Sequence, residues 1–377
     1  MTTDVRAAVI GEVGGKWSIE RLTLRDPGPG EVQIKVMASG LCHSDDHLVT
    51  GDIPNALPMI GGHEGAGIIE KVGPGVTRLA VGDHVATAYL PACGVCTWCA
   101  QGMQYICDTG AGMETGMAQD GSARFHTDSG VGVGAMQRLG TFADRLVTSE
   151  AQAVKIADDL PFDVACLVSC GVATGWGAAV NAGGVRPRDT VIVMGVGGVG
   201  MNAVQGANHA GASYVVAVDP VASKREWAAE FGATHAFASI DEAMPFVRSV
   251  TNGQGADVAV VTVGVVTGEM IAQAFSSVRK EGQVAVVSIG QNEPGLPISP
   301  LELVVYAKKL RGVLFGNCNP TRDIPALLDY YRAGRLKLDE LITRRYSLEE
   351  VNQAYVDMHA GLNLRGVLIH DHSEVSA

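Results

Sequence analysis

The chain has 377 residues, which is more than one ordinary hydrophobic core holds, so we expect two domains. Its formal net charge is -12 and no stretch clusters Lys and Arg, which argues against nucleic acid and anionic membranes as partners. The amino terminus has no long apolar run, so we expect no signal peptide, no membrane span and a cytoplasmic location. In that reducing compartment the eight cysteines are better interpreted as metal ligands, catalytic groups or buried side chains than as disulfides.

The first 170 or so residues form a β-rich region in this interpretation. Short alternating stretches such as EVQIKVMAS and VGDHVATAYL are separated by PGPG, GG and GPG turns. From Asp189 the pattern changes to apolar runs that alternate with helical segments. This alternation predicts a doubly wound parallel sheet of six strands. The predicted strands lie near residues 190–194, 214–219, 235–237, 257–262, 283–288 and 311–315, with helices at about 198–210 and 223–231.

The last part of the chain no longer shows this alternation of strands and helices. It has amphipathic helices predicted at 324–333 and 348–359. We therefore expect an α/β protein with one non-contiguous, β-rich domain at 1–171 and 315–377. A doubly wound (Rossmann) domain is expected at 172–314. His370 and His372 fall in a polar tail that we expect to be mobile.

The segment GVGGVG lies between a predicted strand and a predicted helix, and Asp219 ends the next strand. In such a loop the glycines permit the turn, the approach of a pyrophosphate and close helix packing, while the acidic residue accepts bonds from ribose hydroxyls. Because a carboxylate repels a 2′-phosphate, the pattern favours NAD over NADP. The predicted cofactor loop comprises Gly195, Gly197, Gly198, Val199 and Gly200.

The segment CGVCTWC, with one further cysteine eight residues on, provides four thiolates at spacings that suit one tetrahedral zinc ion. Four sulfur ligands fill the coordination sphere, so the site would be structural and would hold a lobe at about 90–110. Unmetallated thiols and a nucleic-acid zinc ribbon are the alternatives, and the acidic chain argues against the ribbon. The expected ligands are Cys93, Cys96, Cys99 and Cys107.

Three further motifs, GLCHSDDH, GGHEGAGIIEKVGPGV and SCGVATGWGAAV, accompany the zinc lobe, GVGGVG and a late LRGVLIH. With these motifs in this order, the chain resembles the zinc-dependent medium-chain alcohol dehydrogenases nearly from end to end. The segments LVTGDIP, GGHEGAG and VACLVSCGVATGWG are most similar to those of the actinobacterial nicotinoprotein, or nitrosodimethylaniline-dependent, members. The resemblance implies a GroES-like catalytic domain, two zinc ions per chain and NAD(H).

The resemblance also implies a catalytic zinc held by Cys42, His63 and Cys170, with Glu64 as a transient ligand. A Cys₂His set leaves one position open, as a catalytic zinc requires. Asp45 would orient His63.

Ser44 and His47 occupy the positions of the family's proton relay, although a turn-capping serine and a solvated histidine are the plain alternatives. His43 stands where many relatives have an arginine that meets the pyrophosphate. The other positions that match cofactor or substrate contacts are Thr174, Lys224, Val263 and Arg365 for NAD(H), and Tyr89 for the substrate pocket.

The expected function is reversible oxidation of alcohols to aldehydes or ketones by hydride transfer to NAD, with NAD(H) permanently bound in the nicotinoprotein case. The expected partners are a small alcohol or aldehyde, an external electron acceptor and further copies of the chain. Oxidation of a formaldehyde–thiol adduct is one alternative, and an inactive nucleotide-binding regulatory protein is another. The glycine-rich loop at 111–140 has no predicted conformation, and Cys166 and Cys318 are expected to be small buried side chains.

Overall fold

The computed structural model describes residues 2–52, 55–290 and 295–373, and the chain divides into two compact units. Unit 1 comprises Met1–Cys170 and Asn319–Ala377, and unit 2 comprises Gly171–Cys318. The second junction lies later than the expected boundary at 314/315. The reason is that the Cys318 thiol donates to the Ala173 carbonyl at 3.3 Å, and the Asn181 amide donates to the Gly316 carbonyl at 3.3 Å. These bonds keep residues 315–318 with unit 2.

Unit 1 is β-rich, as its alternating sequence predicts. Its described strands form a closed barrel and a second sheet in which β9 pairs with β3 beside the main path. The barrel contains β1 (Thr2–Ile10), β2 (Ser18–Arg25), β7 (Phe125–His126), β8 (Gly132–Ala135) and β4 (Met59–Ile60). The second sheet contains β10 (Ala153–Lys155), β6 (His84–Thr87), β5 (Glu64–Val72), β3 (Glu31–Gly40), β18 (Arg365–Ile369), β17 (Ile342–Tyr346) and β9 (Arg145–Ser149).

Strand β3 shows why this region folds as a sheet. Its apolar side chains at Val32, Ile34 and Val36 recur with period two and are buried, so one face joins the core of unit 1. The principal helices of unit 1 are α1 (His43–Thr50), α2 (Thr97–Ala100), α3 (Phe162–Ala165), α10 (Pro320–Arg332) and α11 (Val351–His359).

The carboxyl-terminal segment completes the sheet of unit 1, because β18 pairs with β3 in antiparallel fashion. The expectation of a mobile tail is wrong for His370, which is 4% exposed and has Nε2 3.1 Å from Ser39 Oγ. His372 Nε2 lies 2.8 Å from the Val36 carbonyl oxygen. Because β18 pairs with the sheet, the residues that follow it, including both histidines, also pack against unit 1.

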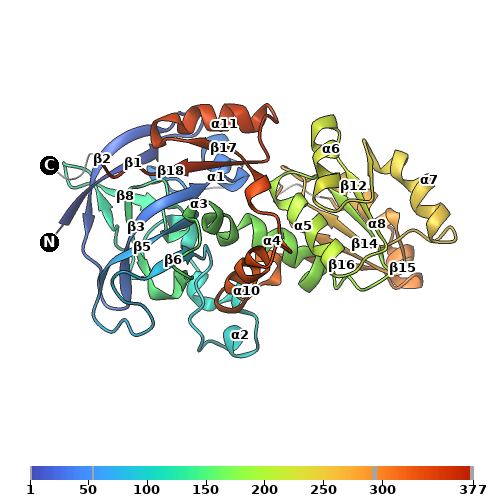
Figure 1. Ribbon diagram of the computed structural model, residues 1–377, viewed down its shortest axis with the longest axis horizontal. Helices are drawn as coiled ribbons and strands as arrows, with labels where there is room; N and C mark the ends of the chain where they lie inside the picture. Colours follow the sequence, from blue (N-terminus) through green and yellow to red (C-terminus); the bar gives the residue numbers. More distant parts are fainter. Residues whose placement is uncertain (1, 53–54, 291–294, 374–377) are drawn as a thin grey trace. The chain divides into compact units, whose positions relative to one another are not determined.

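Unit 2 contains the predicted parallel sheet, with strands in the order β13-β12-β11-β14-β15-β16 in the described ranges. Helices flank the sheet (Figure 1), so the central strand β11 (Thr190–Met194) is buried at every residue. The other strands are β12 (Tyr214–Val218), β13 (His235–Phe237), β14 (Ala256–Val261), β15 (Val278–Val286) and β16 (Lys309–Gly312). The helices include α4 (Gly171–Gly177), α5 (Gly198–His209), α6 (Ala222–Glu230), α7 (Ile240–Val250), α8 (Gly268–Ser277) and α9 (Pro300–Val305).

The sixth strand begins earlier than the expected 311–315. Phe315 and Gly316 have φ values of 53° and 62°, so the chain cannot continue there as an extended strand. The edge strand is therefore Lys309–Gly312, and its four residues pair with β15.

Among the described helices, none is by itself long and apolar enough to cross a membrane. One bent pair, Phe162–Ser169 with Gly171–Ala182, passes the length and composition test together.

Candidate metal centres and cofactor loop

The four cysteines of the CGVCTWC region converge in unit 1. Their sulfur atoms all lie within 4.8 Å of one another, with Cys93 Sγ 3.9 Å from Cys99 Sγ and Cys96 Sγ 3.8 Å from Cys107 Sγ. A tetrahedral zinc with Zn–S bonds of about 2.3 Å places its sulfurs about 3.8 Å apart. The residues present therefore fit a zinc ion with four thiolate ligands.

Backbone amides in the lobe donate to several of these sulfurs, whereas burial raises the pKa of the Cys99 thiol to about 12. The amide of Cys96 donates to Cys93 Sγ at 3.4 Å, and the amide of Cys99 donates to Cys96 Sγ at 3.5 Å. The amides of Cys99 and Asp108 lower the pKa of the Cys96 thiol to about 6. Such donors stabilise negative charge on sulfur without neutralising it.

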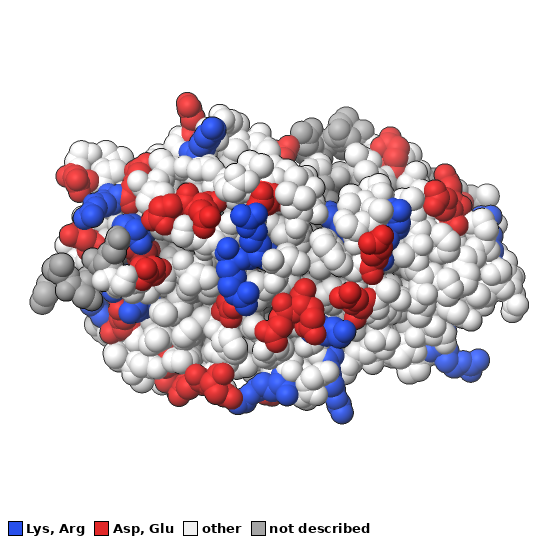
Figure 2. Space-filling view, turned by 45° about the horizontal axis from the view of Figure 1, so that its top comes forward, with Lys and Arg blue, Asp and Glu red and all other residues white. Residues whose placement is uncertain are grey.

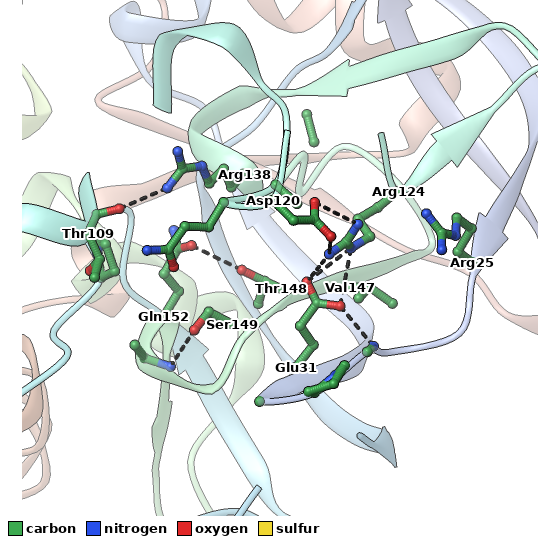
Figure 3. Close-up of a pocket in the computed structure, with 18 of the residues that line it drawn as sticks. Arg25, Glu31, Thr109, Asp120, Arg124, Arg138, Val147, Thr148, Ser149 and Gln152 are labelled. Carbon is green, nitrogen blue, oxygen red and sulfur yellow. Dashed lines mark hydrogen bonds and ion pairs between the residues drawn. The ribbon is translucent and has the colours of Figure 1, made fainter. Parts of the chain in front are cut away.

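The loop at 111–140 lies against this lobe, and Arg138 fixes its conformation. The Arg138 guanidinium donates to the carbonyls of Thr109, Ala111 and Met117, each at 2.8 Å. Figure 3 shows Arg138 reaching Thr109 across one side of a hollow of about 490 Å³. Arg124 bridges Glu31 and Asp120 on the other side.

This hollow does not coincide with the second group of possible metal ligands, Cys42, His63, Glu64 and Cys170. Its described lining includes Cys93 and Thr109 of the zinc lobe but no member of the Cys42, His63, Glu64 and Cys170 group. We therefore assign no substrate to it.

The second metal-ligating group is buried within unit 1. The ligand atoms of Cys42, His63, Glu64 and Cys170 lie within 4.8 Å of one another. Cys42 is the N-cap of α1, His63 precedes β5, Glu64 is the first residue of β5, and Cys170 ends the first segment of unit 1. Two thiolates, one imidazole and one carboxylate are a donor set that suits Zn²⁺, so the group fits a catalytic zinc.

Asp45 connects two of these residues. Its Oδ1 accepts from the Gly62 amide at 2.9 Å and lies 3.0 Å from His63 Nδ1, while its Oδ2 accepts from the Cys42 amide at 3.3 Å. Because Nδ1 faces the carboxylate, His63 is left with Nε2 to bind a metal. Asp45 is fully buried, so its geometry is held by protein groups alone.

Glu64 also forms a buried ion pair with Arg365. Burial raises the pKa of Glu64 to about 7, although Arg365 opposes the shift. Arg365 is 4% exposed and lies 301 residues away in sequence, at the start of β18. Arg365 therefore offsets part of the cost of burying the Glu64 carboxylate.

Gly40 leaves the space that this pair occupies. A Cβ at this position would overlap Glu64 Oε2 and would lie 3.0 Å from Arg365 Nη2. We expect Gly40→Ala to destabilise unit 1 by about 1 to 3 kcal/mol, because overpacking forces buried groups apart. Thermal melting and turnover of the variant measure this effect.

The matched control is Gly11→Ala, because a Cβ there meets no atom within 4 Å and Gly11 is exposed. The control is expected to stay within about 0.5 kcal/mol of the parent protein. Equal melting temperatures for both variants would contradict the role of Gly40.

The two predicted relay residues lie on α1. Ser44 Oγ is 3.6 Å from Cys42 Sγ, which places it beside the metal-ligating group. His47 is 6% exposed, and its Nδ1 lies 3.2 Å from Asp52 Oδ2. Asp52 also accepts a 2.6 Å bond from Thr50 Oγ1.

Tyr89 and His43 also lie in unit 1. The Tyr89 ring meets the His63 ring edge to face at 5.7 Å, so Tyr89 flanks the buried cluster. His43 is exposed at the start of α1, with its ring 6.3 Å from that of His359 on α11.

The glycine loop of unit 2 fits a dinucleotide. Gly195 has a φ of 84°, and a Cβ at Gly200 would overlap the Gly195 carbonyl, so both positions require glycine. A Cβ at Gly197 would meet no atom within 4 Å, which leaves open space in front of the amino end of α5. Gly197 is the N-cap and supplies no side-chain bond, so amides of Gly198 and Val199 remain for a phosphate.

Four of the remaining predicted cofactor contacts lie in unit 2, whereas Arg365 lies in unit 1. Asp219 follows β12 and is 5% exposed, whereas Lys224 on α6 is half-buried. Thr174 is buried on α4, and Val263 is half-buried just after β14. Asp219 and Val263 follow the carboxyl ends of β12 and β14, where doubly wound sheets bind ligands.

Sequence reasoning missed Gly40, Asp52 and Arg138. Asp52 follows Gly51, whose φ of 74° ends α1 and turns the chain back toward His47. The GD pair after the helix is the local signal that could have indicated this contact. Gly40 and Arg138 act on residues distant in sequence, so neither carried a local signal.

Comparisons with known proteins agree with these features. The model "Alcohol dehydrogenase GroES-like domain" matches residues 28–158, and "Zinc-binding dehydrogenase" matches residues 198–332. The NDMA-dependent alcohol dehydrogenase of Amycolatopsis methanolica is 51% identical over 366 residues, 97% of this chain and 98% of that protein.

Two solved structures are also similar. The alcohol dehydrogenase zinc-binding domain protein from Burkholderia ambifaria has a TM-score of 0.93 and 34% identity, covering 99% of this chain and 100% of that chain. The benzyl alcohol dehydrogenase from Acinetobacter calcoaceticus has a TM-score of 0.91 and 32% identity, covering 98% of this chain and 100% of that chain.

Proposed function

Because the chain belongs to the zinc-dependent medium-chain alcohol dehydrogenases, we propose that it oxidises small alcohols while keeping its NAD(H) bound between turnovers. The family membership makes it an oxidoreductase with zinc and NAD(H) as cofactors. The observation that carries the activity is the buried Cys42, His63 and Cys170 group, whose three donors leave one zinc position for an alcohol oxygen. The 51% identity to an NDMA-dependent relative supports the retained cofactor.

When bound, zinc supplies a Lewis acid that favours loss of the alcohol proton, and NAD⁺ supplies the acceptor for the hydride. The protein's own groups must then hold the donor set and carry the proton away. Asp45 orients His63, and the Glu64–Arg365 pair places a neutralised carboxylate beside the thiolates. Tyr89 would form one wall for the alcohol, and primary or aromatic alcohols are the substrate class we propose.

For the proton, we propose a path through Ser44 Oγ and then His47. Ser44 lies beside Cys42, so its hydroxyl can receive a proton from an alcohol at the metal-ligating group. With Nδ1 directed at Asp52, His47 has Nε2 available to accept that proton. The proton would then pass from the buried interior to solvent.

The cofactor contacts we propose are the amides of the glycine loop for the diphosphate, and Asp219 with Lys224 for the adenosine ribose. Thr174 and Val263 are proposed for the nicotinamide, His43 for the phosphates and Arg365 as a further cofactor contact. His43 replaces the arginine of many relatives, and an imidazole offers the phosphates less positive charge and fewer donors than a guanidinium.

The first measurement uses the untreated purified protein. Denaturation is expected to release close to one NAD(H) per chain, and alcohol oxidation is expected to need nitrosodimethylaniline but no added NAD. This result follows because a cofactor that stays bound must pass its hydride to a second substrate. Protein that is empty as purified and driven by added NAD would overturn the retained-cofactor proposal while leaving the alcohol dehydrogenase activity.

For partners, we propose a small alcohol or aldehyde, an external electron acceptor and further copies of this chain, in the cytoplasm. The edge strand β16 and the exposed Val304 and Val305 of α9, 76% and 62% accessible, support pairing between copies. On the face shown in Figure 2, Lys and Arg side chains lie among Asp and Glu side chains. With a net charge of -12, this distribution supports the proposal that neither nucleic acid nor a membrane is a partner.

A further inference from the structure

The turn between β12 and α6 carries Asp219, and backbone amides hold both oxygens of its carboxylate. Oδ2 accepts from the Val196 amide at 3.0 Å, and Oδ1 accepts from the Val221 amide at 2.9 Å. The first bond ties Asp219 to the glycine loop, and the second ties it to its own turn. The carboxylate therefore has one orientation, with its remaining lone pairs available to a ligand.

Arg225 holds the backbone of the same turn. Its Nη1 donates to the Asp219 carbonyl at 2.7 Å and to the Pro220 carbonyl at 2.8 Å. Arg225 is half-buried and is the fourth residue of α6. Its guanidinium thus lies on the backbone of the residue whose side chain faces the cofactor loop.

A cation at this position is unfavourable for the helix itself. The amino end of a helix carries partial positive charge, so a nearby guanidinium is repelled. The N-cap residue Val221 has no side-chain bond to offset this, and the first turn of α6 contains no acidic residue. The hydrogen bonds that Arg225 donates to the carbonyls of Asp219 and Pro220 offset this repulsion.

We propose that Arg225 is a positioning residue for the cofactor, which clamps the 219–220 turn so that Asp219 stays directed at the adenosine ribose. The inference rests on the proposed NAD(H) site. It adds a residue that sets how fast NADH is released and how strongly NADH is preferred over NADPH. A carboxylate that cannot move binds both ribose hydroxyls without an ordering cost. It also cannot turn away from a 2′-phosphate, so NADP(H) is rejected.

The test compares Arg225→Met with Arg248→Met. Methionine keeps much of the side-chain packing and removes the donors, and Arg248 is an exposed cation on α7 that controls for lost charge in the same unit. The dissociation rate of NADH, the Kd values of NADH and NADPH, thermal melting and zinc content are measured on the full chain. Cofactor is removed first where Kd values are required.

We expect Arg225→Met to release NADH about tenfold faster and to lose about tenfold of its preference for NADH over NADPH, because charged hydrogen bonds that order the site are lost. Zinc content is expected to stay at the parental value. Arg225→Lys should give values between those of the parent and of Arg225→Met, since an ammonium keeps the charge but not the planar donor group. Arg248→Met should match the parent.

Parental NADH release and cofactor preference in Arg225→Met would overturn the proposal, even with a lower melting temperature, because the residue would then be only structural. If Arg225→Met does not fold, parental NADH release and cofactor preference in Arg225→Lys would likewise overturn the proposal. A parent protein that releases NADH freely would refute the retained cofactor alone. The ratio of variant to parent would still test Arg225.

Discussion

Replacing Cys42 by serine is expected to lower turnover by at least about 10³-fold in a protein that still folds, because the Lewis acid is worth several kcal/mol of transition-state stabilisation. Cys42 contributes one of the two thiolates in the buried cluster, and its thiol has a lowered pKa. The bond from Cys170 is the main cause of that lowering, which burial opposes. The zinc content should fall from two ions per chain to one, as measured by elemental analysis alongside steady-state kinetics.

The control for this variant is Cys166→Ser. Cys166 is also fully buried in unit 1, but its sulfur donates to the Asp163 carbonyl at 3.2 Å and belongs to neither metal-ligating group. A serine hydroxyl can make the same bond, so both zinc ions and most turnover should remain. Normal turnover in Cys42→Ser with both zinc ions present would refute the catalytic assignment.

Replacing Cys96 by serine is expected to remove the other zinc ion and to lower the melting temperature by about 5 to 10 °C, because binding of a structural metal contributes directly to folding. The lobe around residues 93–107 contains short helical segments and little core of its own, since Cys99 and Cys107 are its buried apolar side chains among those described. Melting curves with and without a chelator, together with zinc analysis, measure the effect.

Val95→Ser is the matched control, because Val95 is the neighbouring residue in the lobe and is 86% exposed. It should keep two zinc ions and the parental melting temperature. A Cys96→Ser protein with full stability and two zinc ions would show that the lobe does not depend on the metal. Together the Cys42 and Cys96 variants separate chemistry from folding at the two centres.

Local spacing in the sequence was enough for several parts of this protein. The four-cysteine lobe could be predicted because its ligands fall within 15 residues, a distance over which a tight loop brings thiolates together. The glycine loop and the six parallel strands could be predicted because the apolar runs and helical segments alternate regularly. The end of β16 was misplaced because the left-handed conformations at Phe315 and Gly316 leave no mark in the apolar pattern.

The buried cluster of Cys42, His63, Glu64 and Cys170 could be predicted only through resemblance to a family. Its members span more than 120 residues, and no periodicity indicates that the end of one sheet strand meets the start of a helix. The structure brings their ligand atoms within 4.8 Å of one another. Their individual chemical roles remain predictions that the variants above test.

The sequence by itself determined the parallel sheet, the glycine loop and the cysteine lobe, because each depends on a pattern within one continuous stretch of the chain. Only the tertiary structure decided which distant side chains support those parts. Arg365 reaches Glu64 because β18 pairs beside β3, and Gly40 on β3 leaves room for the pair. Such contacts arise from packing, which sequence spacing alone does not encode.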